Sequence, residues 1–119
     1  MAVSEKKLSE LTKKERKHLN KITNVCERCG WSVKLHEDYV LLGNESPLGE
    51  DISFEISVDS PASDIYMAYE DFDVDNHVEM LVPMRGTRGV PDSIGALVHD
   101  AGEIEKMLEE LYMAVEKVF

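Results

Sequence analysis

The feature that most restricts the fold of this chain is a strict alternation of apolar and polar side chains over residues 52–59. The alternating residues are, in order, Ile52, Ser53, Phe54, Glu55, Ile56, Ser57, Val58 and Asp59. A period of two places every second side chain on the same face of a β-strand. The fold must therefore contain at least one strand with one buried face.

Two further strands are expected before that segment. Residues 31–35 alternate in the same way, and an apolar run at 39–42 returns after a tight turn at 37–38. Residues 43–44 are expected to end that run, and residues 44–51 to form a loop because they contain proline and glycine. Connections this short favour an antiparallel meander of three strands.

Helices are expected on both sides of these strands. Residues 4–29 place apolar side chains at helical spacing, with Lys and Arg on the other face. Thr12 and Glu15 match a capping box, so a restart of the helix at Thr12 is one interpretation. Gly30 is the expected stop.

The second half of the chain is predicted to be helical. Ser60 and Pro61 indicate a helix start, although residues 64–70 also alternate and allow a strand. A helix capped by Asp73 or Asp75, a loop at 84–91, a short helix from Asp92 or Ser93 and a last helix from Asp100 follow. The chain is thus expected to form one α+β domain. Its parts are a basic helix at 1–30, a sheet at 31–59 and an acidic helical half at 60–119, which packs on the sheet.

The charge is divided unequally along the chain, which carries −11 in total. Residues 1–40 hold nine Lys/Arg against six Asp/Glu, whereas residues 41–119 hold four against eighteen. An acidic surface repels phosphate backbones, so direct nucleic-acid binding is disfavoured and a basic partner is allowed. No apolar run reaches the length of about 18 residues that a membrane helix needs, and no signal peptide is recognised. The expected location is the cytoplasm.

Two patterns resemble metal or redox sites. Cys26 and Cys29 form a C-x-x-C, but a second pair is absent and the motif closes a helix, so both are expected on the inner face of the helix. The aspartates at 71, 73 and 75 with His77 resemble the start of a calcium loop. Asn76 and Val82 then occupy positions where such a loop needs Gly and Glu. Capping of a helix is the simpler interpretation.

Arg85 and Arg88 lie in a glycine-containing loop and are the only basic residues between Lys34 and Lys106. Two guanidinium groups can bind a carboxylate or phosphate in a bidentate manner, so this loop is a candidate for anion or partner binding. The alternative is that both arginines pair with surrounding carboxylates.

Several segments together resemble a known group of proteins. They are Ser46-Pro47-Leu48-Gly49-Glu50-Asp51, Phe72-Asp73-Val74-Asp75-Asn76-His77-Val78, Gly89-Val90-Pro91, Asp100-Ala101 and Glu103-Ile104. Over residues 31–115 the chain resembles a family of small acidic uncharacterised proteins of phages and mobile elements of Gram-positive bacteria. The resemblance implies an accessory gene of a mobile element and assigns no catalytic residue.

The sequence therefore predicts a non-enzymatic binding protein without a cofactor or metal, which acts as an inhibitor presenting an acidic surface to a basic protein partner. The candidate partner-binding residues are Arg85, Arg88, Asp71, Asp73 and Asp75. One alternative is a metal-binding module or metal-dependent enzyme that uses residues 71–77. Another is a structural protein that self-associates through its methionine-rich helices.

Overall fold

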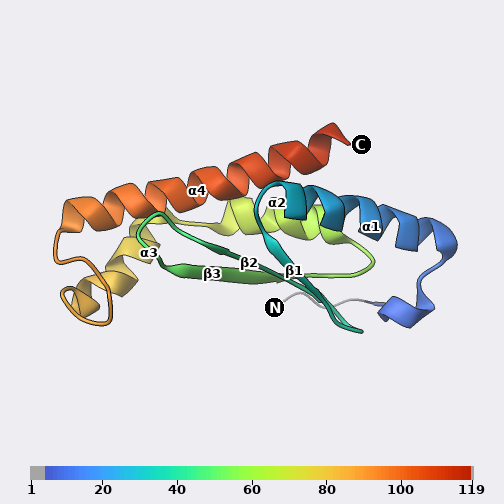
Figure 1. The fold of residues 1–119 in the computed structure, drawn as a ribbon, viewed down its shortest axis with the longest axis horizontal. Helices are drawn as coiled ribbons and strands as arrows, with labels where there is room; N and C mark the ends of the chain where they lie inside the picture. The colour runs from blue at the N-terminus through green and yellow to red at the C-terminus, as the bar shows by residue number, and fades with distance from the viewer. Residues whose placement is uncertain (1–4, 119) are drawn as a thin grey trace.

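The computed structural model describes residues 5–118. It is an α+β fold in which, along the chain, an N-terminal helix is followed by a three-stranded sheet and then by a helical second half, and α1, α2 and α4 lie on the same side of the sheet (Figure 1). The elements are η1 (Leu8–Glu10), α1 (Lys13–Arg28), β1 (Ser32–Leu35), β2 (Val40–Glu45), β3 (Asp51–Ile56), α2 (Pro61–Asp71), α3 (Val74–Leu81), η2 (Val82–Met84) and α4 (Ile94–Lys117). The helical α2 rules out the strand alternative for residues 64–70.

The sheet is the predicted antiparallel meander, with the strands in the order β1-β2-β3. The expected end of the second strand at 43–44 is wrong, because Asn44 pairs with Ile52 and Glu45 with Asp51. Gly43 lies within β2, opposite Ser32, and the close approach of that side chain makes glycine suitable here. A Cβ atom there would lie 2.8 Å from the hydroxyl of Ser32, which donates a hydrogen bond to the Gly43 carbonyl at 3.2 Å.

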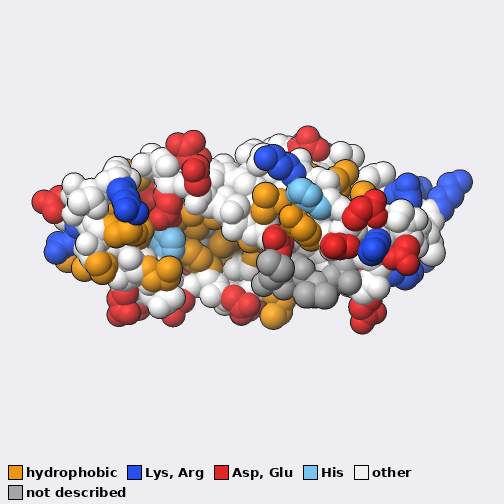
Figure 2. Space-filling view, turned by 90° about the horizontal axis from the view of Figure 1, so that it is seen from below, with side chains coloured by type: hydrophobic (Ala, Val, Ile, Leu, Met, Phe, Trp, Pro, Cys, Tyr) orange, Lys and Arg blue, Asp and Glu red, His pale blue; other side chains and the backbone are white. Residues whose placement is uncertain are grey.

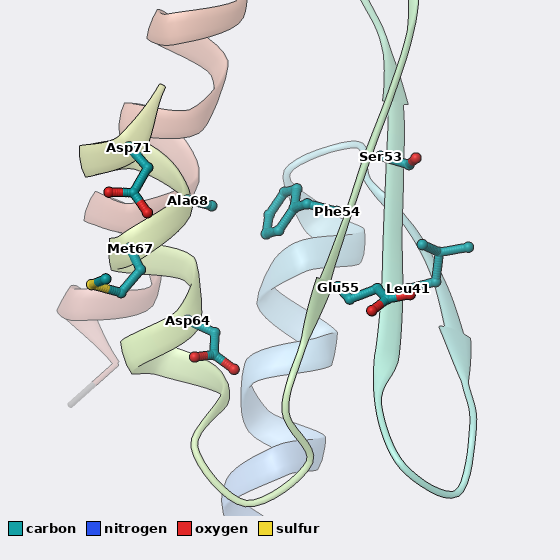
Figure 3. A pocket seen from close by; sticks show the side chains of 8 residues that line it. All are labelled: Leu41, Ser53, Phe54, Glu55, Asp64, Met67, Ala68 and Asp71. Carbon is teal, nitrogen blue, oxygen red and sulfur yellow. The ribbon is translucent and has the colours of Figure 1, made fainter. Parts of the chain in front are cut away.

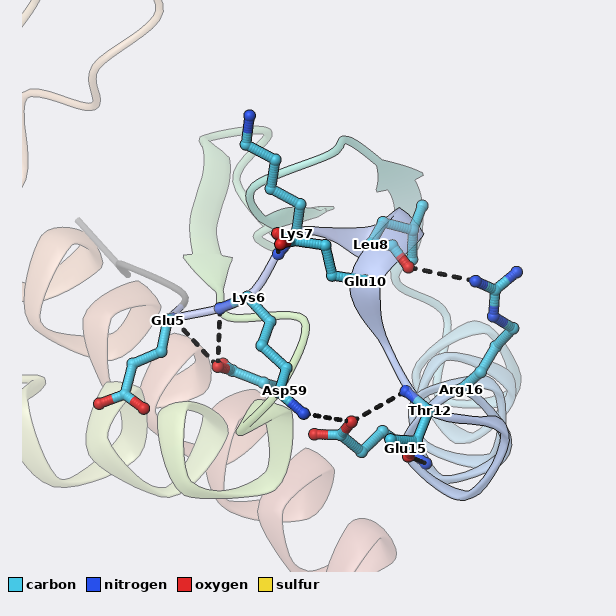
Figure 4. A network of polar contacts seen from close by, with 9 residues as sticks. All are labelled: Glu5, Lys6, Lys7, Leu8, Glu10, Thr12, Glu15, Arg16 and Asp59. Atoms are coloured by element: carbon cyan, nitrogen blue, oxygen red, sulfur yellow. Dashed lines mark hydrogen bonds and ion pairs between the residues drawn. The ribbon is translucent and has the colours of Figure 1, made fainter.

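The chain before α1 is held by local polar contacts (Figure 4). Thr12 Oγ1 accepts from the Glu15 N–H at 3.1 Å and Glu15 Oε1 accepts from the Thr12 N–H at 2.9 Å, so the helix does restart at the capping box. Lys6 Nζ lies 2.7 Å from Glu15 Oε1. The Asp59 carboxylate accepts the N–H groups of residues 5 and 6 at 3.0 and 3.2 Å, which fastens the segment to the end of the sheet.

The last helix is longer than expected. The predicted break at Asp100 is wrong, because α4 continues through it for 24 residues from its cap at Ser93. Asp100 is buried within α4, and its Oδ1 accepts the backbone N–H of Leu48 at 3.1 Å. The carboxylate therefore binds a distant loop instead of starting a new helix. The sequence predicts that loop but carries no sign of its contact with Asp100.

Two clusters of apolar side chains make up the core. The main cluster joins the sheet with α1, α2 and α4, and it contains Trp31, Ile56, Leu108 and Leu111. Phe54 is only partly buried against it and meets Trp31 edge-on, with ring centroids 5.5 Å apart. The satellite cluster consists of Val78, Leu97 and Ala101, where α3 packs on the first half of α4.

The molecule is elongated, with extents of 50 × 25 × 20 Å, and α4 runs along its length (Figure 1). Within the described part of the chain, no helix combines the length and apolar character needed to cross a bilayer.

Candidate functional site

A groove of about 570 Å³ lies between the sheet and α2 (Figure 3). We call it the acidic groove, and its lining residues are Leu41, Ser53, Phe54, Glu55, Asp64, Met67, Ala68 and Asp71. The sheet contributes Leu41 of β2 and three residues of β3 to the groove. β3 is an edge strand because its only partner among residues 5–118 is β2. An edge strand leaves a row of backbone N–H and C=O groups unpaired.

The position of α2 beside β3 is fixed by a contact at one end of the groove. The buried Ser57, just after β3, donates its N–H to Asp64 Oδ2 at 2.6 Å. Phe54 points from β3 toward α2 in Figure 3 and supplies an apolar wall together with Met67 and Ala68. The groove therefore combines apolar surface with carboxylates, of which Asp64 is held in place by the Ser57 N–H.

Glu55 is the unusual member of this set. Its Oε2 atom is buried and has no hydrogen-bond partner within residues 5–118. A buried acceptor without a donor costs roughly 1–3 kcal/mol, and more when it is charged. A donor brought into the groove by a ligand would remove that cost.

The electrostatic character of the groove follows from its composition. Three carboxylates line it, those of Glu55, Asp64 and Asp71, and no basic residue does. In the described chain none of the three forms an ion pair. Basic side chains visible in Figure 2 gather mainly toward the end of the molecule that carries α1, whereas acidic ones run along its length. The groove therefore favours a cationic ligand.

The acidic residues predicted from the sequence fall in different places. Asp71 lines the acidic groove. Asp73 caps α3 by accepting the Asn76 N–H at 3.2 Å, which confirms the capping interpretation, and Asp75 is exposed in the first turn of α3. His77 Nε2 lies 2.7 Å from Glu50 Oε2, so this imidazole pairs outside the segment. Among the described residues, no group of three His, Cys, Asp or Glu side chains is placed to hold a metal ion.

The two arginines lie away from the groove, in the loop after η2. Arg85 Nε donates to the Val82 carbonyl at 3.3 Å, and Arg88 lines a separate, smaller cavity. Within residues 5–118 neither arginine forms an ion pair, so the expected pairing with surrounding carboxylates is not found. The structure does not bring the arginines and Asp71 into one site.

The cysteines differ from each other. Cys26 is buried in the main cluster, and burial raises the pKa of its thiol to about 12. Cys29 is exposed at the C-cap of α1, so the expectation that both face inward holds only for Cys26. Partial burial also raises the pKa of the Cys29 thiol. Neither thiol has the lowered pKa of a redox centre.

Glu55 and Asp64 were not predicted as site residues. Glu55 occupies a polar position of an alternating strand, where solvent exposure is the ordinary expectation, and Asp64 resembles any acid in a first helical turn. Comparison of the chain with protein-family models, curated proteins and solved structures found no match.

Proposed function

We propose that the protein is a non-enzymatic binding protein that holds a basic, extended segment of a protein partner in the acidic groove. One observation carries the proposal: the edge strand β3 and three carboxylates line the same groove, and none of the three carboxylates forms an ion pair in the described chain. While its basic segment is bound in this groove, the partner cannot use that segment. The protein would therefore act as an inhibitor.

The backbone of the segment would pair with β3. Addition of a strand to an exposed sheet edge is a common mode of peptide recognition, in which main-chain hydrogen bonds supply affinity and side-chain pockets supply specificity. β3 spans six residues, Asp51–Ile56, and every second one directs its N–H and C=O groups away from β2. The helix α2 forms the opposite wall of the groove. It would therefore make the bound segment run along β3.

The side chains of the segment would be Lys or Arg. Their aliphatic stems fit against Phe54, Met67 and Ala68, and their charged ends reach the surrounding carboxylates. Glu55 Oε2 is the acceptor that gains most, because it has no hydrogen bond in the described chain. Arginine suits this role because its planar fork binds carboxylates in a bidentate manner.

The charge of the whole molecule supports the same choice of partner. The surplus of acidic residues after residue 40 attracts a basic segment and speeds its encounter with the groove. The same field opposes duplex DNA. The resemblance of residues 31–115 to proteins of phages and mobile elements suits an accessory inhibitor, and two unpaired cysteines suit a reducing compartment such as the cytoplasm.

Fluorescence anisotropy with a labelled peptide of alternating Arg and Val tests the proposal. We expect binding that weakens as salt rises, and that falls by about tenfold or more in Glu55→Gln, since a hydrogen bond to a charged group is worth roughly 1.5–3 kcal/mol. Asp75→Asn removes an equal charge outside the groove and serves as the matched control. A peptide with N-methylated backbone amides should bind more weakly, because it cannot pair with β3.

Two results would overturn the proposal. Equal binding by Glu55→Gln, Asp71→Asn and Asp75→Asn would mean that general acidity, and not the groove, attracts the peptide. A clear electrophoretic shift of duplex DNA would assign the basic helix to nucleic-acid binding. The control is a variant in which five basic residues of this helix are replaced by Ser, and it should no longer shift the DNA. These residues are Lys13, Lys14, Arg16, Lys17 and Lys21.

A further inference from the structure

A second, smaller cavity of about 180 Å³ lies where the loop before β3, the loop after η2 and the first half of α4 meet. Its apolar lining residues are Leu48, Leu81, Val90, Pro91 and Leu97, and its charged ones are Glu50, Arg88 and Asp100. None of these residues lines the acidic groove. Pockets for drug-sized ligands usually span roughly 300–1,000 Å³, so this cavity suits a smaller molecule.

The negative side of the cavity is Asp100. This residue is only 5% exposed, and its Oδ1 accepts the Leu48 N–H. In residues 5–118 its carboxylate forms no ion pair. A buried carboxylate without a counter-charge is unfavourable, so a cationic donor inside the cavity would be stabilised. Glu50, by contrast, already pairs with His77.

The positive side is Arg88. Its backbone lies in the left-handed region, with φ at +50°, although it is not a glycine. Such a conformation persists only where its surroundings impose it, and it is common at ligand sites. Here the loop imposes it through hydrogen bonds from Gly86 N–H to the Val90 carbonyl (3.0 Å) and from Val90 N–H to the Thr87 carbonyl (2.8 Å). The loop therefore presents an arginine with no ion pair in the described chain to the cavity.

We infer that this cavity binds a small zwitterion with an apolar side chain, that is, a free apolar α-amino acid. The carboxylate of the ligand binds the Arg88 guanidinium, its ammonium group binds Asp100, and its side chain packs against Leu81, Val90 and Leu97. The two charged groups of the protein line one cavity without forming an ion pair with each other. A ligand that carries both charges satisfies both, whereas a simple amine or a simple carboxylate satisfies one and is repelled by the other.

Titration calorimetry and thermal unfolding with leucine test this inference. The probes for comparison are 4-methylpentanoate, which lacks the ammonium group, and 3-methylbutylamine, which lacks the carboxylate. We expect leucine to raise the melting temperature in a concentration-dependent manner, because a ligand that binds only the folded state stabilises it. We expect each of the two analogues to bind at least tenfold more weakly, since each loses one charge-assisted contact.

The variants Arg88→Gln and Asp100→Asn should each weaken leucine binding at least tenfold, whereas Arg85→Gln should leave it unchanged. Arg85 is the matched control because it lies in the same loop but does not line the cavity. Asn at position 100 keeps an acceptor for the Leu48 N–H, and circular dichroism checks that each variant is folded. The inference is wrong if leucine does not bind, or if Arg88→Gln and Asp100→Asn bind it as well as Arg85→Gln does. Neither outcome bears on the acidic groove.

Discussion

Asp100 Oδ1 accepts the backbone N–H of Leu48 at 3.1 Å, across 52 residues of sequence. This contact fastens the loop between β2 and β3 to the first half of α4. Aspartate usually caps helices, yet Asp100 is buried inside α4. The contact with Leu48 explains this, because it gives the Asp100 carboxylate a role in the fold.

Removing that carboxylate should destabilise the protein. We expect Asp100→Ala to lower the free energy of unfolding by roughly 1–3 kcal/mol, because the Leu48 N–H loses its acceptor. Asp100→Asn keeps an acceptor and should cost less. Urea unfolding followed by circular dichroism measures both variants, and equal losses would show that the negative charge, and not the hydrogen bond, is what stabilises the loop.

The main cluster should depend strongly on α4. Leu111 is fully buried, so we expect Leu111→Ala to cost roughly 2–5 kcal/mol of unfolding free energy through lost transfer energy and the cavity left behind. Met113 lies two residues away and is 50% exposed, and Met113→Ala should change stability by no more than about 0.5 kcal/mol. A loss of less than about 1 kcal/mol for Leu111→Ala would mean that α4 is peripheral to the core.

The two thiols should react at very different rates. Cys29 is exposed, whereas Cys26 is buried and burial raises its pKa to about 12. We therefore expect iodoacetamide at pH 8 to modify Cys29 in the folded protein and to reach Cys26 only after unfolding. Mass spectrometry of the native and denatured protein distinguishes the sites. Modification of Cys26 at the same rate as Cys29 would show that the end of α1 opens readily.

The start of α1 should become less stable in acid. The pKa of Glu15 is lowered to about 2, first by the hydrogen bond from Lys6 and then by the backbone N–H of Thr12. A lowered pKa in the folded state contributes stability above the unfolded value, near 4.5, and this stability is lost as pH falls toward 2. The stability difference between the wild type and Glu15→Gln should therefore shrink between these pH values. Denaturant unfolding of the wild type and Glu15→Gln, measured from pH 5 to pH 2, checks this, and a difference that stays constant would contradict it.

Local signals in the sequence predicted most of the elements correctly. The alternation around Phe54 marks a strand, and Thr12, Gly30 and Asp73 begin or end helices, because a period or a cap depends only on neighbouring residues. The break at Asp100 was wrong because a distant backbone N–H uses the carboxylate. In sequence, an aspartate that caps a helix looks the same as an aspartate that binds a distant N–H from inside a helix.

The candidate site was less predictable than the fold. Asp71 was among the predicted residues, but Glu55 and Asp64 become site residues only because α2 folds back beside the edge of β3. That placement depends on the Ser57–Asp64 contact and on packing of α2 against α4. Both are tertiary features, and a carboxylate on an alternating strand looks the same in sequence whether water or a helix faces it.

The single long helix α4 bridges two cores of very different size. Its C-terminal half belongs to the main cluster, whereas its N-terminal half shares the satellite cluster with α3. Because the satellite cluster is small, the region around it opens locally more easily than the region around the main cluster. Amide protons of α3 should therefore exchange with deuterium through partial opening, whereas those of residues 104–115 should exchange only through global unfolding. Protection against exchange then falls along the long axis of the molecule, and the end that holds the smaller cavity opens first.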